Sequence, residues 1–302
     1  MKESSLNKDS GTSTVFLTAY DSAEKVRDME EGVNFMWIGM DCGASNVKIA
    51  YEEGNQLRLK SYPAEKSHSL LQWLHSAYPQ SRIALTGGGA HSLFDKLPPA
   101  QIRIFSEFDA IEAGFRAQNR EEAALLLHSG TGSSFFVFRE KEKGERVLGS
   151  AMGGGMILGL ARFLYGNSFD EKDLYTKIQD GDRLQVDLLV KDIYTESSPV
   201  MGDLTASQFA KASESSRPSD MLASTVQSVA EVFVLLSQQL AEKIPTKRVY
   251  LSGGAFSYIA PLVERIKSFE EMTGLSFQQV EQGMFLGAKG ARELALAEMR
   301  RK

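Results

Sequence analysis

Short runs of apolar residues, separated by small turn residues, open each half of this chain. In the first half, the runs at 35–40, 47–51 and 57–61 predict strands that pair in sequence. In the second half, the runs at 124–127 and 135–138 predict another hairpin of the same kind. The repetition predicts an internal duplication, in which two similar units each begin with paired strands.

Helical periodicity follows each hairpin. We expect helices at 70–77, 107–119, 156–164, 218–243 and from 284 to the C-terminus, and short strands at 82–85, 102–105 and 249–251. Strands and helices in this order are typical of an α/β protein. Because no low-complexity linker separates the halves, we expect two lobes, at 36–120 and 121–302, that pack closely around a hinge.

Composition narrows the classes of function. The 302 residues are enough for two domains with substantial cores, and 42% of them are apolar. The net charge of −5 gives no reason to expect nucleic acid or an anionic membrane, and the apolar run at 232–236 is too short to span a bilayer. Cys42 is the only cysteine, which excludes an intrachain disulfide and fits a reducing cytoplasm.

The N-terminal segment differs from the rest of the chain. Residues 1–13 are polar, which predicts disorder, and they lack the apolar core of a secretory signal. Glu30-Glu31-Gly32 back-translates to a sequence that can spell a bacterial ribosome-binding site, and Met36 follows at a suitable distance. We therefore expect 1–35 to be a disordered or non-native extension with Met36 as the natural start, which the intact mass of the native protein checks.

Two turns of small residues have the composition of phosphate-binding loops. Asp41 ends the first predicted strand, where a carboxylate either holds Mg²⁺ or accepts hydrogen bonds from turn amides; Lys48 lies beyond this turn. Residues 130–134 consist only of glycine and hydroxyl residues, which favours a phosphate cradle. The glycines at 153–155 precede a helix, whose N-terminus attracts anions, although close packing explains them equally well.

Charged residues near these turns are candidates for catalysis. Glu107 and Asp109 lie where a strand joins a helix, and either is placed to act as a general base or simply to cap the helix. Arg146 precedes the glycine run and is a candidate to stabilise a transferring phosphate. The histidines lack metal-ligand spacing, and His128 is more typical of a packed or cleft-lining residue.

Several blocks in order resemble the type II pantothenate kinases, members of the actin-like, hexokinase-like superfamily. They are Asp41 to Lys48, 85–88, 107–110, 130–132, 153–159, 181–183 with 187–188, and 202–206. The resemblance implies two actin-like (ribonuclease H-like) α/β lobes with mixed sheets around a nucleotide cleft. It also implies a cytoplasmic homodimer that uses ATP and Mg²⁺ to phosphorylate pantothenate to 4'-phosphopantothenate, the first step of coenzyme A biosynthesis.

The resemblance assigns roles residue by residue. Glu107 resembles the catalytic base, Arg146 matches an arginine expected near the transferred phosphate, and Asp41 remains the candidate metal ligand. The remaining matches resemble nucleotide contacts: Asp41, Cys42, Gly43, Ala44, Ser45, Asn46, Val47, Lys48, Thr131, Gly154, Gly155, Met156, Ile157 and Leu158.

Departures from the family pattern leave alternatives open. Ala44 and Ser45 replace a glycine and a threonine, and Ala44 fits only if its φ angle is negative. A tyrosine expected after the glycine helix falls at Phe169 or Glu171. The alternatives are an actin-like-fold sugar or amino-sugar kinase with Asp109 as its base, and a non-catalytic nucleotide-binding sensor.

Overall fold

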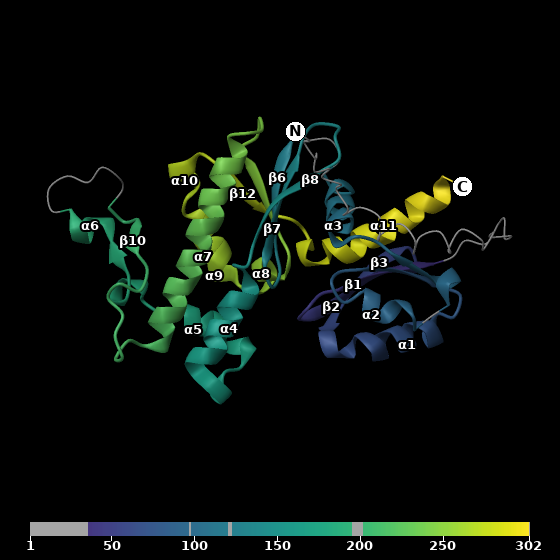
Figure 1. Ribbon diagram of the computed structural model, residues 1–302, viewed down its shortest axis with the longest axis horizontal. Coiled ribbons are helices and arrows are strands. Elements are labelled where there is room, and N and C mark those ends of the chain that lie inside the picture. The colour runs from purple at the N-terminus through teal and green to yellow at the C-terminus, as the bar shows by residue number, and fades with distance from the viewer. Residues whose placement is uncertain (1–35, 97, 120–122, 195–201, 302) are drawn as a thin grey trace, which may run out of the picture.

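The first sheet contains the N-terminal hairpin. The computed structural model describes residues 36–96, 98–119, 123–194 and 202–301 (Figure 1). The sheet has the order β3-β2-β1-β4-β5, in which β1, β2 and β3 are antiparallel and β4 and β5 run parallel to β1. Its strands are β1 (Trp37–Cys42), β2 (Asn46–Glu53), β3 (Gln56–Pro63), β4 (Arg82–Thr86) and β5 (Ile102–Ile104). The strands predicted here are confirmed.

The second sheet repeats this topology. Its order is β12-β11-β6-β7-β8, with an antiparallel meander over β6 to β8 and parallel pairing of β11 with β6 and β12. Its strands are β6 (Ala124–Ser129), β7 (Ser133–Phe138), β8 (Glu145–Ser150), β11 (Arg248–Ser252) and β12 (Ser276–Gln279). The predicted duplication and α/β class are confirmed, whereas β8 and β12 were not predicted because neither contains a continuous run of apolar residues.

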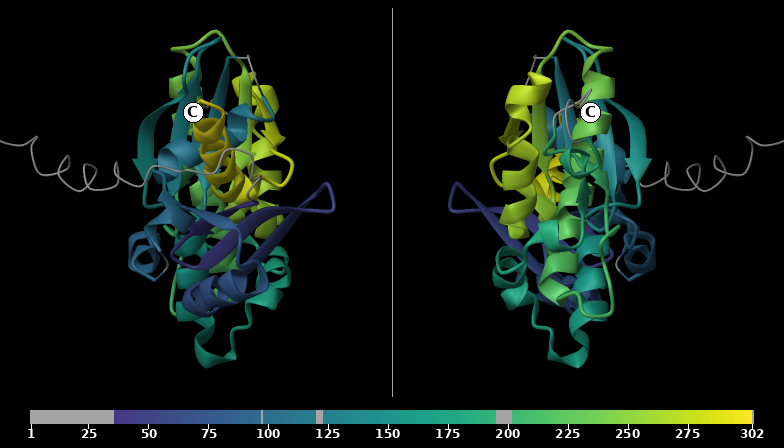
Figure 2. Two further views of the ribbon diagram at one scale, coloured as in Figure 1. Left: turned by 90° about the vertical axis from the view of Figure 1, so that its right-hand side faces the viewer. Right: turned by 90° about the vertical axis from the view of Figure 1, so that its left-hand side faces the viewer.

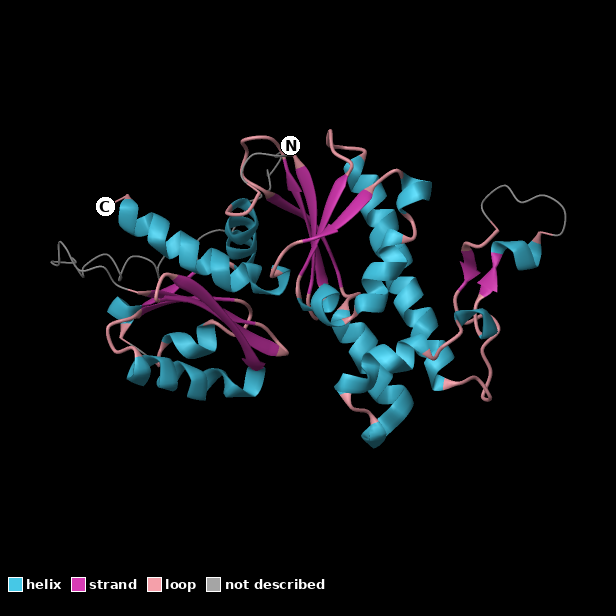
Figure 3. Ribbon diagram, turned by 180° about the vertical axis from the view of Figure 1, so that it is seen from behind, coloured by secondary structure: helices cyan, strands magenta, loops and turns pink. Residues whose placement is uncertain are grey.

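Helices cover both sheets. In Figure 3 the first sheet lies between α1 with α2 on one face and α11 on the other. The helices are α1 (Ser67–Ala77), α2 (His91–Phe94), α3 (Glu107–Arg116), α4 (Gly154–Tyr165), α5 (Leu174–Gln179), α6 (Val190–Ile193), α7 (Pro218–Ala241), α8 (Gly254–Tyr258), α9 (Ala260–Lys267), α10 (Glu270–Thr273) and α11 (Leu286–Arg300). In both views of Figure 2 the purple strands of the first sheet lie below the teal strands of the second.

The C-terminal helix returns to the first sheet. Although α11 follows the second sheet in the sequence, it packs on β1, β4 and α3. Ala291 and Ala295 of α11 are buried with Trp37 of β1. The predicted boundary at 120 and 121, like the predicted extension at 1–35, falls on residues outside those that the structure describes.

The long helix α7 is a core helix of the second lobe. Among the described residues it is the one helix long and apolar enough to be a candidate membrane span, but 67% of its apolar window is buried inside the protein. Leu222, Val226 and Phe233 lie in one cluster with residues of β6, β7 and β11. This packing is typical of a helix that supports a sheet.

A small module of β9 (Leu188–Leu189), β10 (Thr205–Ser207) and α6 projects beyond α7 (Figure 1). A buried carboxylate, Asp187, anchors its base. Asp187 accepts hydrogen bonds from the Ser224 hydroxyl of α7 and the backbone N–H of Phe209, and Arg183 Nη1 lies 3.3 Å from its Oδ2. Arg183 also donates to the Thr205 hydroxyl at 3.0 Å and to the Asp203 carbonyl at 3.3 Å, so the family blocks at 181–183 with 187–188 and at 202–206 form one polar junction.

The crossing of α3 and α11 depends on glycines. A Cβ atom on Gly290 would lie 1.7 Å from the Ala110 carbonyl oxygen, and one on Gly114 would lie 2.2 Å from that of Leu286. Because backbone carbonyls cannot rotate away as side chains can, the two helix axes have to separate if either glycine gains a side chain.

We expect Gly290→Ala to destabilise the protein by about 3 kcal/mol, because overpacking against backbone outweighs the better helix propensity of alanine. Thermal unfolding measures this effect. Gly159→Ala is the matched control, since a Cβ atom there meets nothing within 4 Å, and it should leave the melting temperature unchanged or slightly higher. Equal melting temperatures for the two variants would contradict the prediction.

Candidate active site

A cleft of about 970 Å³ lies where the turns of the two hairpins meet. The first hairpin turn and the 130–134 turn both line it, together with the start of α3 and the start of α4. Most of the residues singled out from the sequence border this cleft: Asp41, Gly43, Ala44, Ser45, Asn46, Lys48, Glu107, Thr131, Arg146, Gly154, Gly155 and Leu158. Residues from both lobes thus converge on one site.

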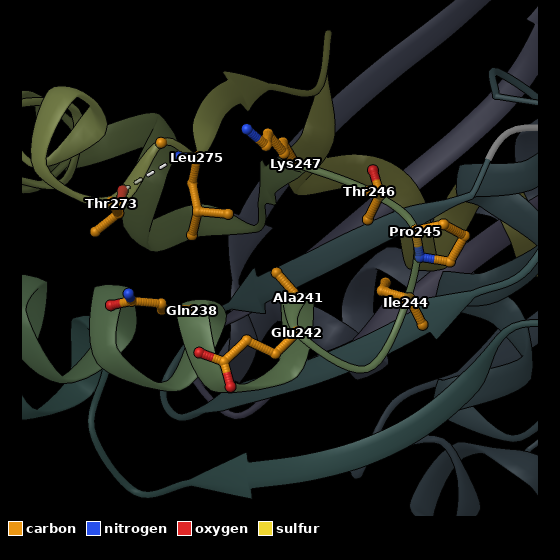
Figure 4. A pocket seen from close by; sticks show the side chains of 10 residues that line it. Gln238, Ala241, Glu242, Ile244, Pro245, Thr246, Lys247, Thr273 and Leu275 are labelled. Atoms are coloured by element: carbon orange, nitrogen blue, oxygen red, sulfur yellow. Dashed lines mark hydrogen bonds between the residues drawn. The ribbon is translucent and has the colours of Figure 1, made fainter.

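A second depression, of about 510 Å³, lies beyond the C-terminal end of α7 (Figure 4). Apolar side chains such as Ile244 and Leu275 form much of its wall. Its acid, Glu242, and its base, Lys247, come from opposite sides (Figure 4). This arrangement lacks the converging charges of the cleft between the lobes, which is therefore the candidate active site.

The two small-residue turns face each other across the cleft. Ser45 Oγ lies 3.4 Å from Thr131 Oγ1, so the hydroxyls of the two lobes are in contact. Ala44 does not have a positive φ angle. The turn therefore accommodates alanine in place of the family's glycine. Backbone and hydroxyl donors from both turns can therefore approach one polyphosphate chain from opposite sides.

Asp41 and Lys48 form a charged pair in the first lobe. Asp41 is 7% exposed, and its Oδ2 lies 3.7 Å from Lys48 Nζ. Burial raises the pKa of the Asp41 carboxyl above its usual value, and Lys48 partly offsets this rise. Gly87 and Gly287 leave room for the carboxylate, since a Cβ atom on either would come within 2.8 Å of its oxygens. Because the 3.7 Å separation from Lys48 is longer than a hydrogen bond, the Asp41 carboxylate can accept a further ligand.

Glu107 begins α3 and opens onto the same cleft. Burial raises the pKa of its carboxyl above the usual glutamate value, and the charge of Asp41 raises it further. Lys48 and Arg146 act in the opposite direction on this pKa. A carboxylate surrounded by these charges has the environment of a tuned general base.

Asp109, the alternative base, has a different environment. Its Oδ1 accepts a hydrogen bond from Lys143 Nζ at 2.7 Å, and this ion pair is partly exposed to solvent. Asp109 is absent from the described lining of the cleft. Of the two acids at the start of α3, the structure brings only Glu107 to the site.

The glycines at the start of α4 connect it to the Thr131 turn. The N–H of Gly154 donates to the Gly130 carbonyl at 2.9 Å, and that of Gly155 donates to the Thr131 carbonyl at 3.0 Å. A Cβ atom on Gly155 would lie 2.6 Å from the Thr131 methyl group. These two N–H groups therefore hold the 130–134 turn against the start of α4.

Some residues singled out from the sequence lie away from the described lining. Cys42, Val47 and Ile157 are buried in the hydrophobic cores, and Met156 is exposed on α4. The strand and helix periods explain this, because neighbours of a cleft residue on the same element face the other way.

Several cleft residues carried no clear sequence signal. Phe108 follows Glu107, and Tyr175 and Tyr258 form part of the wall in the second lobe. The two tyrosines come from the short helices α5 and α8 and were not singled out from the sequence; the tertiary structure brings them to the cleft. Of the two candidates for the family's aromatic position, Glu171 borders the cleft, whereas Phe169 stacks on Tyr165.

His128 lies in the cleft as a neutral side chain. Its Nδ1 is 2.9 Å from Ser252 Oγ, which joins the ends of β6 and β11. Burial lowers the pKa of His128 to about 3, and the charge of Lys48 lowers it in the same direction. The imidazole is therefore uncharged near neutral pH and adds no positive charge to the site.

Comparisons with known proteins agree on one family. The Fumble family model matches residues 103–270. A type II pantothenate kinase of Oceanobacillus iheyensis is 32% identical over 263 residues, which cover 84% of this chain and 97% of that protein. A type II pantothenate kinase of Staphylococcus aureus is 32% identical over 267 residues, covering 85% of this chain and 98% of that protein.

Solved structures of lower identity share the fold. An activator of 2-hydroxyisocaproyl-CoA dehydratase from Clostridium difficile, with bound ADPNP, has a TM-score of 0.59 at 15% identity, over 88% of this chain and 96% of that one. A ROK family glucokinase from Streptomyces griseus, in complex with glucose and AMPPNP, has a TM-score of 0.53 at 13% identity. The match covers 86% of this chain and 98% of that one. The paired sheets, the shared cleft and the extent of the sequence match lead to one conclusion: this chain belongs to the type II pantothenate kinase family.

Proposed function

We propose that this chain phosphorylates pantothenate with ATP, and that Glu107 is the general base. The observation that carries the proposal is the Glu107 carboxyl, which opens onto the cleft among Asp41, Lys48 and Arg146 and whose pKa is raised. In the reaction, Glu107 takes the proton of the primary hydroxyl as that oxygen bonds to the γ-phosphorus. The bond from this phosphorus to the β,γ-bridging oxygen breaks, and ADP leaves with the electron pair.

Charges on both lobes support the transfer. Lys48 of the first lobe and Arg146 of the second border the cleft from opposite sheets. Positive groups held in place before the reaction stabilise charge that develops on the transferring phosphoryl group, without reorganising during it. Ser45 and Thr131 add hydroxyl donors from the two turns. The nucleotide contacts assigned by resemblance remain part of this proposal.

The residues present fit a bound Mg²⁺ ion. Among the described residues no cluster of three or more histidine, cysteine or acidic side chains is placed to hold a metal alone. Mg²⁺ at kinase sites instead takes one or two carboxylates together with substrate phosphates, and Asp41 offers such a carboxylate at the lining of the cleft. When bound there, Mg²⁺ supplies charge neutralisation to the phosphates.

A product assay tests the proposed function. Purified protein is incubated with MgATP and pantothenate, pantetheine or N-acetylglucosamine, and mass spectrometry identifies the phosphorylated product. We expect phosphopantothenate. Phosphorylation of N-acetylglucosamine alone would favour the sugar-kinase alternative, and nucleotide binding without turnover on any acceptor would favour the sensor. The homodimer and the cytoplasmic location implied by the resemblance stay predictions.

We expect Glu107→Gln to lower kcat by about 10²–10⁴-fold, because the amide cannot accept the hydroxyl proton. Asp109→Asn is the matched control, since Asp109 forms a partly exposed ion pair with Lys143, and it should change kcat far less. Steady-state kinetics with MgATP and pantothenate measure both. The opposite order of effects would assign the base to Asp109.

The pH dependence of kcat/KM follows from the environment of Glu107. The pKa of Glu107 is raised from 4.5. We therefore expect kcat/KM to fall as the pH decreases, with the midpoint of this acidic limb above pH 4.5. Arg146→Gln removes a positive charge that lowers this pKa, so the limb should move to higher pH in the active fraction that remains. A limb set by Asp41 would stay in place, since burial and Lys48 cause its shift.

A further inference from the structure

Arg146 is an exposed side chain in a defined position. Its Nε donates a hydrogen bond to Ser134 Oγ at 3.1 Å, and its guanidinium carbon lies 4.5 Å from the centre of the Phe108 ring. An exposed arginine without such contacts samples many rotamers, and ordering it costs conformational entropy. The contacts of Arg146 therefore determine how far its side chain is ordered before substrate binds.

A β-bulge in β8 places Arg146 and Gly149 on the same face of the strand. Phe135 pairs with Leu148, but Phe136 pairs with Arg146, so Val147 is an additional residue in the strand. In a regular strand, residues three apart point to opposite faces. The extra residue instead places Arg146 on the same face as Gly149, which pairs with Ser134.

Gly149 provides the space in which the guanidinium lies. A Cβ atom on Gly149 would come 2.0 Å from Arg146 Nη2 and 3.1 Å from Cζ, while the next nearest atom, the Ser133 carbonyl oxygen, is 3.4 Å away. A methyl group at this position would displace the end of a flexible side chain and would leave the backbone contacts intact. Gly149 also has no positive φ angle, so alanine fits its backbone.

Phe108 completes the arrangement from the start of α3. It follows Glu107 on α3, and its ring packs edge-to-face with that of Phe136 on β7, with the ring centroids 6.2 Å apart. A guanidinium over an aromatic face gains cation–π attraction, which is strongest when water is excluded. Because the base and this aromatic ring are adjacent in the chain, any movement of the start of α3 moves both relative to Arg146.

We propose that Phe108, Ser134 and Gly149 form an arginine cradle whose role is to hold Arg146 in position for phosphoryl transfer. The proposal rests on the proposed function, in which Arg146 stabilises the transferring group. The three cradle residues act through Arg146 and are positioning residues. The bulge at Val147 is the backbone feature that allows the cradle to form.

The principal test is Gly149→Ala alone and combined with Arg146→Ala. Misplacing a catalytic group by about 1 Å costs on the order of 10²-fold, so we expect kcat to fall by about that factor toward the value of Arg146→Ala. The melting temperature should stay at the wild-type value. In the Arg146→Ala background, Gly149→Ala should cause no further loss, because the group it displaces is gone.

Phe108 variants test the aromatic face. Phe108→Tyr keeps the ring and should retain most of the wild-type kcat, whereas Phe108→Leu keeps apolar volume without the ring and should lower kcat more than it raises KM. Gly159→Ala is the matched glycine control and should retain wild-type kcat, since its Cβ meets nothing within 4 Å. Equal kcat for the leucine and tyrosine variants would remove Phe108 from the cradle.

A spectroscopic readout separates this inference from the proposed function. The ¹⁵N–¹H signal of Arg146 Nε, assigned by its absence in Arg146→Lys, should be protected in the wild-type protein and shifted in Gly149→Ala. Wild-type kcat in Gly149→Ala, or an equal loss in the Arg146→Ala background, would overturn the cradle. Failure of the wild type to phosphorylate pantothenate would overturn the proposed function, while the Arg146 signal would still test the cradle.

Discussion

The contact between α3 and α11 is the constraint on which the rest of the structure depends. Each helix packs on a different sheet, so their crossing fixes the distance between the lobes. Gly114 and Gly290 allow backbone to approach backbone, which leaves no flexible side chain to absorb a change. The same contact positions the cleft, because α3 begins at Glu107 and α11 begins beside Asp41.

Electrostatics at the cleft follow from this packing. Gly287, in the first turn of α11, lies against the Asp41 carboxylate, and burial raises the pKa of that group. The charge of Asp41 in turn raises the pKa of Glu107 across the cleft. Lys48 lowers both pKa values, and it also keeps His128 neutral by adding to the effect of burial. The charge of Lys48 therefore acts on the pKa values of three neighbouring groups, Asp41, Glu107 and His128.

The two sheets contribute different groups to the proposed chemistry. The first sheet carries Asp41 and Lys48, while the second supplies Arg146 and the Thr131 turn. Glu107 begins α3, which packs on the second sheet, and Phe108 follows it in the chain and lies under Arg146.

The sequence by itself determined the strand hairpins, the α/β class, the duplication and the turns that line the cleft. These features depend on local periodicity and on small residues at turns, which are visible without tertiary contacts. The local pattern alone left Glu107 and Asp109 equivalent, because two acids near a helix start look alike, and only the family resemblance favoured Glu107. The tertiary structure adds that Asp109 pairs with Lys143, whereas Glu107 borders the cleft. It also decided the return of α11 to the first sheet, the bulge at Val147 and the tyrosines of the cleft wall, since contacts between distant segments leave no periodic signal in the chain.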